Sequence, residues 1–258
     1  MLKGRIGEDF TNKQPEPTEQ DPNNFEINVP NPAKYKIDWE THKVVNIKNL
    51  FPELQANILW DYYFNQSSDF WNTIVHPDPY FNYADNGVTG DDGYFHIPYF
   101  KEDDPTIPSR LKHAHEVRNK NGFSYYYKRT DILHSYLNIF FSPKFRQLLE
   151  YITGHQNLEV EPANTFVSCY ESGHYNGHHT DGINGRIAFV FHMSKDWEVW
   201  DGGLFMSMDW DWKTVNKVIV PPFNTLTIFD VSNGRPHFVS EVAQNCDNKR
   251  ISFTGWYQ

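Results

Sequence analysis

Two histidines and one aspartate offer the clearest chemistry in this sequence. His179 and Asp181 lie two residues apart in "YESGHYNGHHTD", after one β-rich run and before another. In an extended segment, residues two apart project to the same side, so both side chains can bind one metal ion. His174 and His178 have no carboxylate two residues further on, and His178 would face away from His179. We therefore interpret His174 and His178 as bystanders.

A third ligand is available downstream. His237 follows the apolar run "TLTIFDV", and with His179 and Asp181 it completes a set of two histidines and one carboxylate. Such a set leaves three coordination positions open and suits non-haem Fe(II), which must bind a co-substrate and O₂. A structural zinc ion would need a fourth ligand, preferably cysteine, and the two cysteines have no zinc-site spacing. A second pair, His76 and Asp78, lies in the proline-interrupted "HPDPY", which we interpret as a turn.

The final β-rich run carries a candidate anion clamp. Arg250 and Ser252 lie two apart in "KRISFTGWYQ" and project to the same side. A guanidinium fork beside a hydroxyl suits the far carboxylate of a dicarboxylic acid. The alternative is that Arg250 is a surface charge beside Lys249 after a turn.

Short β-rich runs must position these side chains. From residue 156 onward they are separated by glycine, asparagine and proline, as in "NTFVSCY", "GRIAFVFHM", "GGLFMSM", "NKVIVPP", "TLTIFDV", "HFVSEV" and "KRISFTGWY". This texture predicts a mainly β (α+β) fold, with flanking helices and a sandwich or jelly-roll core. Helices that precede the strands without alternating with them disfavour a parallel α/β sheet.

Two helices are predicted before this β-rich part. The first is indicated by apolar residues that recur every four positions, which we expect to form its buried face: Leu50, Leu54, Ile58 and Tyr62. The second can begin with Ser142 as N-cap and Pro143 in the first turn, and Gly154 can end it. Its expected apolar face consists of Phe145, Leu148, Leu149 and Ile152.

The remaining segments complete the expected domain organisation. Residues 1–33 contain five prolines and few apolar residues, which predicts a flexible arm. Residues 34–258 are expected to form a single catalytic domain. Within it, the region 76–122 is rich in glycine, proline, aspartate and aromatic residues, and we expect a lid-like loop that contacts substrate. The alternative for this region is a second small core packed over the helices.

Global composition limits the partners. The 258 residues carry a formal net charge of −10, which argues against nucleic acid because that affinity depends on cationic contacts with phosphate. No apolar run approaches membrane-spanning length, and the first residues lack the apolar core of a signal peptide. We therefore expect a soluble, intracellular, cytoplasmic protein that makes no membrane contact.

The order His-x-Asp, His, Arg-x-Ser resembles the Fe(II)/2-oxoglutarate-dependent oxygenases. The local sequence is similar to that of their prolyl 4-hydroxylase-like members, and closest to the branch that hydroxylates a proline of a small-subunit ribosomal protein. The segments that carry this resemblance are "YESGHYNGHHTD", "GRIAFVFHM", "DGGLFMSM", "VIVPPFNTLTIFDVS", "HFVSEV" and "RISFTGWY". "FSYYYKRTDIL" resembles the early strand and helix start of the same branch, so the likeness extends over residues 123–258.

The resemblance implies a double-stranded β-helix with iron at one mouth. The iron ligands it implies are His179, Asp181 and His237. The 2-oxoglutarate contacts it implies are Arg250, Ser252, Tyr170 and His192. It also implies that Tyr175 and Arg186 lie at the substrate rim, with a structural role at the start of a strand as the alternative for Arg186. The sequence departs from the branch at His192, where a tyrosine that contacts 2-oxoglutarate is usual, and it ends at Gln258, where the branch usually continues into a further β-helix domain.

The activity implied is that of an Fe(II)- and 2-oxoglutarate-dependent dioxygenase that consumes O₂, with ascorbate as a stimulant. The expected substrate is a prolyl residue in a peptide or protein, a ribosomal protein being one candidate. Three alternatives stay open. The same chemistry could act on a small molecule or free amino acid, the jelly roll could bind metal without catalysis, or the substrate could be a methylated nucleic acid, which the acidic charge opposes.

Overall fold

The computed structural model describes residues 27–76, 122–129, 134–181, 184–232 and 234–258. Its helices are α1 (Pro32–His42), α2 (Glu53–Phe64) and α4 (Pro143–Thr153), and its 3₁₀ turns are η2 (Ser68–Phe70), η4 (Ser135–Phe141), η5 (Pro162–Asn164) and η6 (Val199–Asp201). Its strands are β1 (Val44–Lys48), β2 (Asn72–His76), β3 (Phe123–Arg129), β4 (Phe166–Tyr170), β5 (Tyr175–His179), β6 (Ile187–His192), β7 (Phe205–Met208), β8 (Val215–Ile219), β9 (Thr225–Asp230), β10 (His237–Val239) and β11 (Arg250–Tyr257).

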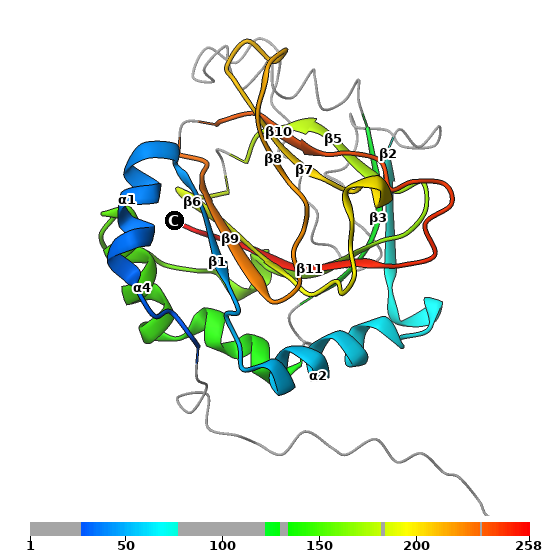
Figure 1. The fold of residues 1–258 in the computed structure, drawn as a ribbon, viewed down its shortest axis with the longest axis horizontal. Coiled ribbons are helices and arrows are strands. Elements are labelled where there is room, and N and C mark those ends of the chain that lie inside the picture. Colours follow the sequence, from blue (N-terminus) through cyan, green and yellow to red (C-terminus); the bar gives the residue numbers. More distant parts are fainter. Residues whose placement is uncertain (1–26, 77–121, 130–133, 182–183, 233) are drawn as a thin grey trace, which may run out of the picture.

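Every pairing between these strands is antiparallel. They form one sheet in the order β1-β9-β6-β11-β4-β3-β5-β10-β7-β8, and β2 also pairs with β3. The sheet curves over itself, so that β5, β10, β7 and β8 (the minor layer) lie across from β1, β9, β6 and β11 (the major layer) (Figure 1). The predicted jelly-roll core is confirmed by this topology and by the fold likeness reported below.

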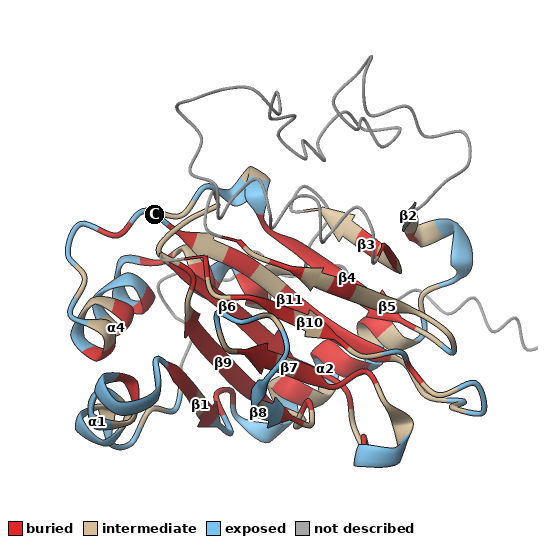
Figure 2. Ribbon diagram, turned by 90° about the horizontal axis from the view of Figure 1, so that it is seen from above, coloured by how far each residue is buried: buried red, intermediate tan, exposed pale blue. Residues whose placement is uncertain are grey.

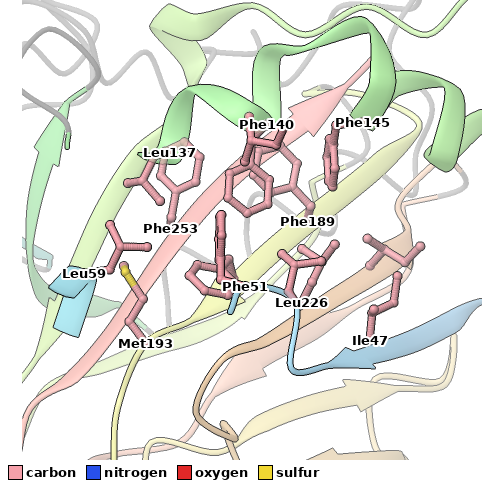
Figure 3. Packing of buried hydrophobic residues seen from close by; sticks show 14 of the residues in the cluster. Ile47, Phe51, Leu59, Leu137, Phe140, Phe145, Phe189, Met193, Leu226 and Phe253 are labelled. Carbon is pink, nitrogen blue, oxygen red and sulfur yellow. The ribbon is translucent and has the colours of Figure 1, made fainter. Parts of the chain in front are cut away.

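The outer face of the major layer packs against the helices. Alternation along each strand sends one set of side chains outward, including Phe189 and Phe191 of β6 and Phe253 of β11. These rings meet Phe140 of η4, whose ring stacks on Phe189 at 5.3 Å between centroids (Figure 3). The strands β6, β9 and β11 are buried along most of their length (Figure 2), and their buried polar residues include His192, Thr227 and Ser252.

Helix α4 has the ends that the sequence predicts. The Ser142 side chain accepts a hydrogen bond from the Phe145 amide at 3.1 Å, Pro143 opens the first turn, and Gly154 ends the helix at φ 75°. Such a left-handed C-cap favours glycine because it has no Cβ. Phe145, Leu149 and Ile152 are buried as expected, and Leu148 is partly buried.

The predicted face of the first helix is wrong. α2 begins at Glu53, after Leu50, and Leu54 and Ile58 are 73% and 36% exposed. The helix buries a second apolar stripe with the i, i+3, i+4, i+7 spacing instead, which consists of Ala56, Leu59, Trp60 and Tyr63. The large aromatic side chains in that stripe bury more area than the stripe that recurs every four residues.

The order of elements is also more mixed than expected. β1 lies between α1 and α2, and β2 and β3 lie between α2 and α4. Helix α1 and the strands β1, β2 and β5 were not predicted from the sequence. α1 begins at Pro32, two residues inside the predicted arm, while residues 1–26 and the predicted lid, from 77 to 121, lie outside the described residues. In the part that the structure describes, no helix is both long enough and apolar enough to cross a bilayer.

Candidate active site

The structure brings the three predicted metal ligands together on the inner face of the minor layer. His179 ends β5 and is directly paired with His237, the first residue of β10. Asp181 follows two residues later, with Oδ1 3.6 Å from His179 Nε2 and Oδ2 3.2 Å from His237 Nε2. All three side chains are buried, and one candidate ligand atom of each lies within 4.8 Å of the others.

Backbone carbonyls orient both imidazoles toward the carboxylate. His179 Nδ1 lies 2.7 Å from the carbonyl oxygen of Gly177, and His237 Nδ1 lies 3.2 Å from that of Arg235. A carbonyl can only accept, so each Nδ1 carries the proton and each Nε2 lone pair points toward Asp181. Metal-binding histidines are commonly held in place in this way, by a hydrogen bond from the ring nitrogen that does not bind the metal. The donor set of two imidazoles and one carboxylate therefore fits a divalent metal ion such as Fe(II).

Arg250 is a buried cation that has no acidic partner among the described residues. Only 2% of its surface is exposed, and no carboxylate among the described residues pairs with it. Its Nη1 lies 3.4 Å from Ser252 Oγ, its Nε has no hydrogen-bond partner in the described part of the chain, and its guanidinium lies over the Tyr170 ring at 5.0 Å. Burial lowers the pKa of Arg250 from its ordinary value. A desolvated, uncompensated cation is costly, and an anionic ligand would offset that cost.

Ser252 and Tyr170 lie beside the Arg250 guanidinium. β11 pairs with β4 so that Arg250 is opposite Tyr170 and Ser252 is opposite Ser168. The two serine hydroxyls lie 3.0 Å apart, and the Tyr170 ring stacks on Tyr125 at 4.9 Å. The register of two neighbouring strands thus positions the guanidinium, its aromatic support and two hydroxyls. The residues present fit the distal carboxylate of 2-oxoglutarate.

His192 belongs to the same polar surface. It ends β6, is directly paired with Ser252 of β11, and is 1% exposed. Its Nε2 lies 3.1 Å from Thr227 Oγ1, and the Thr227 hydroxyl donates to Asn46 Oδ1 at 2.8 Å. His192 Nδ1 has no partner among the described residues. Burial first, and the Arg250 charge second, hold the pKa of His192 well below its ordinary value.

Sequence reasoning missed a glycine that makes room for Arg250. Gly203 precedes β7 at φ 58°, and a Cβ at this position would lie 2.9 Å from Arg250 Cδ and 3.1 Å from a ring carbon of Trp197. The conformation and the contact both favour glycine. The signal was the Gly-Gly pair in "DGGLF", but its meaning depends on a strand nearly fifty residues away.

Asn176 is a second missed residue. Its Nδ2 lies 3.5 Å from His179 Nε2, and its Oδ1 is buried without a partner in the described part of the chain. Asparagine between Tyr175 and Gly177 carries no spacing signal. Both residues lie in β5, three apart, where the register between β5 and β10 shifts, so a regular alternation of faces does not predict the contact.

The two predicted rim residues, Arg186 and Tyr175, lie in different parts of the structure. Arg186 lies beyond the opposite end of β6 from His192 and donates to the backbone carbonyls of Gln156, Asn157 and Gln258. The structure thus does not bring Arg186 to the triad. Tyr175 begins β5, four residues from His179, and is half-buried opposite Ser124.

The other histidines also have defined places. His178 packs on Phe238, with 4.2 Å between ring centroids. His174 Nδ1 accepts a hydrogen bond from the Glu171 amide. Neither belongs to the described metal cluster. His76 ends β2, so that strand reaches further than the predicted turn, and Asp78 lies outside the described residues.

Comparison with known proteins agrees with this geometry. Residues 165–258, which contain the triad, Arg250 and His192, match the family model of the 2OG-Fe(II) oxygenase superfamily. Over 121 residues the chain is 36% identical to a protein from Xenopus laevis named prolyl 3-hydroxylase OGFOD1, and over 131 residues it is 32% identical to prolyl 3,4-dihydroxylase OGFOD1 from Ostreococcus tauri. These matches cover 44% and 45% of this chain but only 22% and 24% of the relatives, so the chain spans about a quarter or less of their length.

Solved structures share the fold at low sequence identity. An oxidoreductase of the 2OG-Fe(II) oxygenase family from Burkholderia pseudomallei superposes with a TM-score of 0.57 at 13% identity, covering 91% of this chain and 93% of that one. A prolyl-4-hydroxylase from Pseudomonas putida gives 0.54 at 15% identity, covering 88% and 98%. A Trichoplax adhaerens prolyl hydroxylase, in complex with a hypoxia inducible factor peptide fragment, gives 0.53 at 16% identity and covers 88% of both chains.

Proposed function

We propose that this chain, whose residues 165–258 match the family model of the 2OG-Fe(II) oxygenase superfamily, is an Fe(II)- and 2-oxoglutarate-dependent dioxygenase that hydroxylates a prolyl residue in a peptide or protein. One observation carries the proposal. Two histidines and a carboxylate converge on a metal-sized space, and the same fold buries an arginine that has no acidic partner among the described residues. A metal-binding jelly roll without catalysis would have no use for such a buried cation.

Two sets of residues would bind the metal and the co-substrate. His179, Asp181 and His237 would hold the metal and leave positions open beside it. Arg250, with Ser252 and Tyr170, would hold the distal carboxylate and so fix the direction of the co-substrate. A bound Fe(II) ion would activate O₂, with one oxygen atom entering the hydroxylated product and the other entering succinate as 2-oxoglutarate loses CO₂. Ascorbate is expected to stimulate turnover.

The choice of a prolyl substrate rests on similarity. The relatives from Xenopus laevis and Ostreococcus tauri are named for prolyl hydroxylation. The resemblance over residues 123–258 makes a proline in a small-subunit ribosomal protein the first substrate to test. Proline favours extended backbone, so a groove can hold a proline peptide at low entropic cost.

The test is succinate production from 2-oxoglutarate under Fe(II) and O₂, with proline peptides compared with the same peptides carrying alanine. We expect the proline peptides alone to stimulate turnover and to gain one oxygen by mass spectrometry. His179→Ala should abolish both readouts. Stimulation by free amino acids, with none by proline peptides or ribosomal protein, would favour a small-molecule substrate instead. No succinate under any condition would contradict the oxygenase proposal.

A further inference from the structure

The hydrogen bonds around His192 determine which ring nitrogen carries the proton. The Thr227 hydroxyl has one hydrogen, and it donates that hydrogen to Asn46 Oδ1. Toward His192, Thr227 can therefore only accept, so His192 Nε2 must be the donor in the 3.1 Å contact. In the neutral ring this leaves Nδ1 as a bare acceptor.

An unprotonated Nδ1 cannot donate a hydrogen bond to an anionic ligand. Nδ1 is buried and has no partner among the described residues, and the strand partner of His192 is Ser252, which contacts Arg250. A carboxylate offers only lone pairs, and two acceptors that face each other in a buried site repel. A phenol at this position, as in the resembled branch, would donate its own hydrogen without any change of charge.

We propose that His192 takes up one proton from solvent at Nδ1 when 2-oxoglutarate binds, so that affinity for the co-substrate falls as pH rises. This inference rests on the proposed function. The imidazole gains one positive charge and donates through both nitrogens, while no bond of 2-oxoglutarate forms or breaks. The incoming dianion supplies the negative charge that the free site lacks.

The groups around the imidazole agree with this direction. Within the described ranges, the charged or titratable residues that face the same interior are Arg250 of β11, Tyr170 of β4, Lys217 of β8, and the triad of His179, Asp181 and His237. The residues contacted on β9 and β1, Thr227 and Asn46, do not titrate. In the free protein, burial and Arg250 keep the pKa of His192 well below its ordinary value, so the ring starts neutral near pH 7. A bound carboxylate acts in the opposite sense and raises this pKa.

The expected pH dependence follows from linkage. Carboxyl groups of this kind have pKa values near 4, so 2-oxoglutarate stays a dianion from about pH 6 to 8. Between the pKa of His192 in the free protein and its pKa in the complex, binding takes up one proton. In that window, the dissociation constant of 2-oxoglutarate should rise by up to tenfold for each pH unit.

Isothermal titration calorimetry of the full chain loaded with Mn(II) tests this proposal. Titrating 2-oxoglutarate in two buffers that differ in ionisation enthalpy counts the protons taken up. We expect an uptake approaching one proton for the wild type and for His42→Gln, an exposed histidine that serves as control. His192→Tyr should bind without uptake and with a pH-independent dissociation constant.

A second variant keeps the imidazole. Thr227→Val removes the acceptor at Nε2, so the ring can place its proton on Nδ1 without taking up another, and uptake should fall toward zero. Wild-type binding without uptake would overturn the inference and leave the proposed function standing. Uptake that persists in His192→Tyr would also overturn it. Absence of any 2-oxoglutarate binding would overturn both.

Discussion

Among the residues of the site, Arg250 gives the strongest indication of an anionic ligand. Its guanidinium is buried beside Tyr170 and Ser252, its Cδ passes Gly203, and it has no carboxylate partner in the described part of the chain. Removing one member of a desolvated charge pair costs roughly 2–5 kcal/mol. We therefore expect Arg250→Ala to raise the apparent constant for 2-oxoglutarate by more than tenfold.

Arg250→Lys is the matched variant for this measurement. It keeps the charge but cannot make two parallel hydrogen bonds to one carboxylate, so we expect it to recover only part of the affinity. Steady-state succinate production as a function of 2-oxoglutarate concentration gives both constants. An unchanged constant in Arg250→Ala would place the carboxylate contact elsewhere, with His192 the next residue to test.

The residues of the site differ in how far the sequence could predict them. His179 with Asp181, and Arg250 with Ser252, could be paired because residues two apart on a strand share a face. Gly203 and Thr227 could not, because each contacts a side chain of a strand remote in sequence. Spacing within one strand is visible in a sequence, whereas register between strands is not.

At the scale of elements, α4 was predicted with its ends because capping chemistry is local. Ser142→Ala removes the hydrogen bond to the Phe145 amide and should lower the free energy of unfolding by about 1 kcal/mol. Ser67 precedes η2 without a side-chain capping bond, so Ser67→Ala should change it by less than about 0.5 kcal/mol. Urea unfolding of both variants measures the difference, and equal losses would contradict the capping role.

The buried face of α2 shows the limit of the same reasoning. Helical periodicity allows two apolar stripes in this segment, and only tertiary packing decides between them. The stripe with Trp60 and Tyr63 faces the sheet, whereas Leu54 stays 73% exposed. Most strands after residue 156, with β5 the exception, were easier to predict because turn residues mark their ends.

At the scale of the whole molecule, the metal site joins separate parts of the chain. His179 and His237 come from different strands, so a bound ion adds a link that the unfolded chain lacks. A ligand at 100 times its dissociation constant stabilises the folded state by about 2.7 kcal/mol. For a chain of this size, roughly 2–4 °C per kcal/mol gives a rise in Tm of about 5–10 °C with Mn(II).

Single variants separate the triad from its neighbours in this measurement. His178→Ala should keep the full rise in Tm, because its ring packs on Phe238. His179→Ala and His237→Ala should lose the rise. Loss of the rise in His178→Ala would mean that the ligand register is shifted by one residue.

The unequal pairing of the two layers has a consequence for how the protein opens. β10 has three residues, its register with β5 shifts after His237, and β5 contacts β3 through two residue pairs. β11, by contrast, pairs over five residues with β4 and six with β6. Amide hydrogens of the minor layer should therefore exchange with solvent before those of the major layer. In such partly open states His237 parts from His179 while Arg250 stays in place, so the metal would leave before the co-substrate anchor is lost.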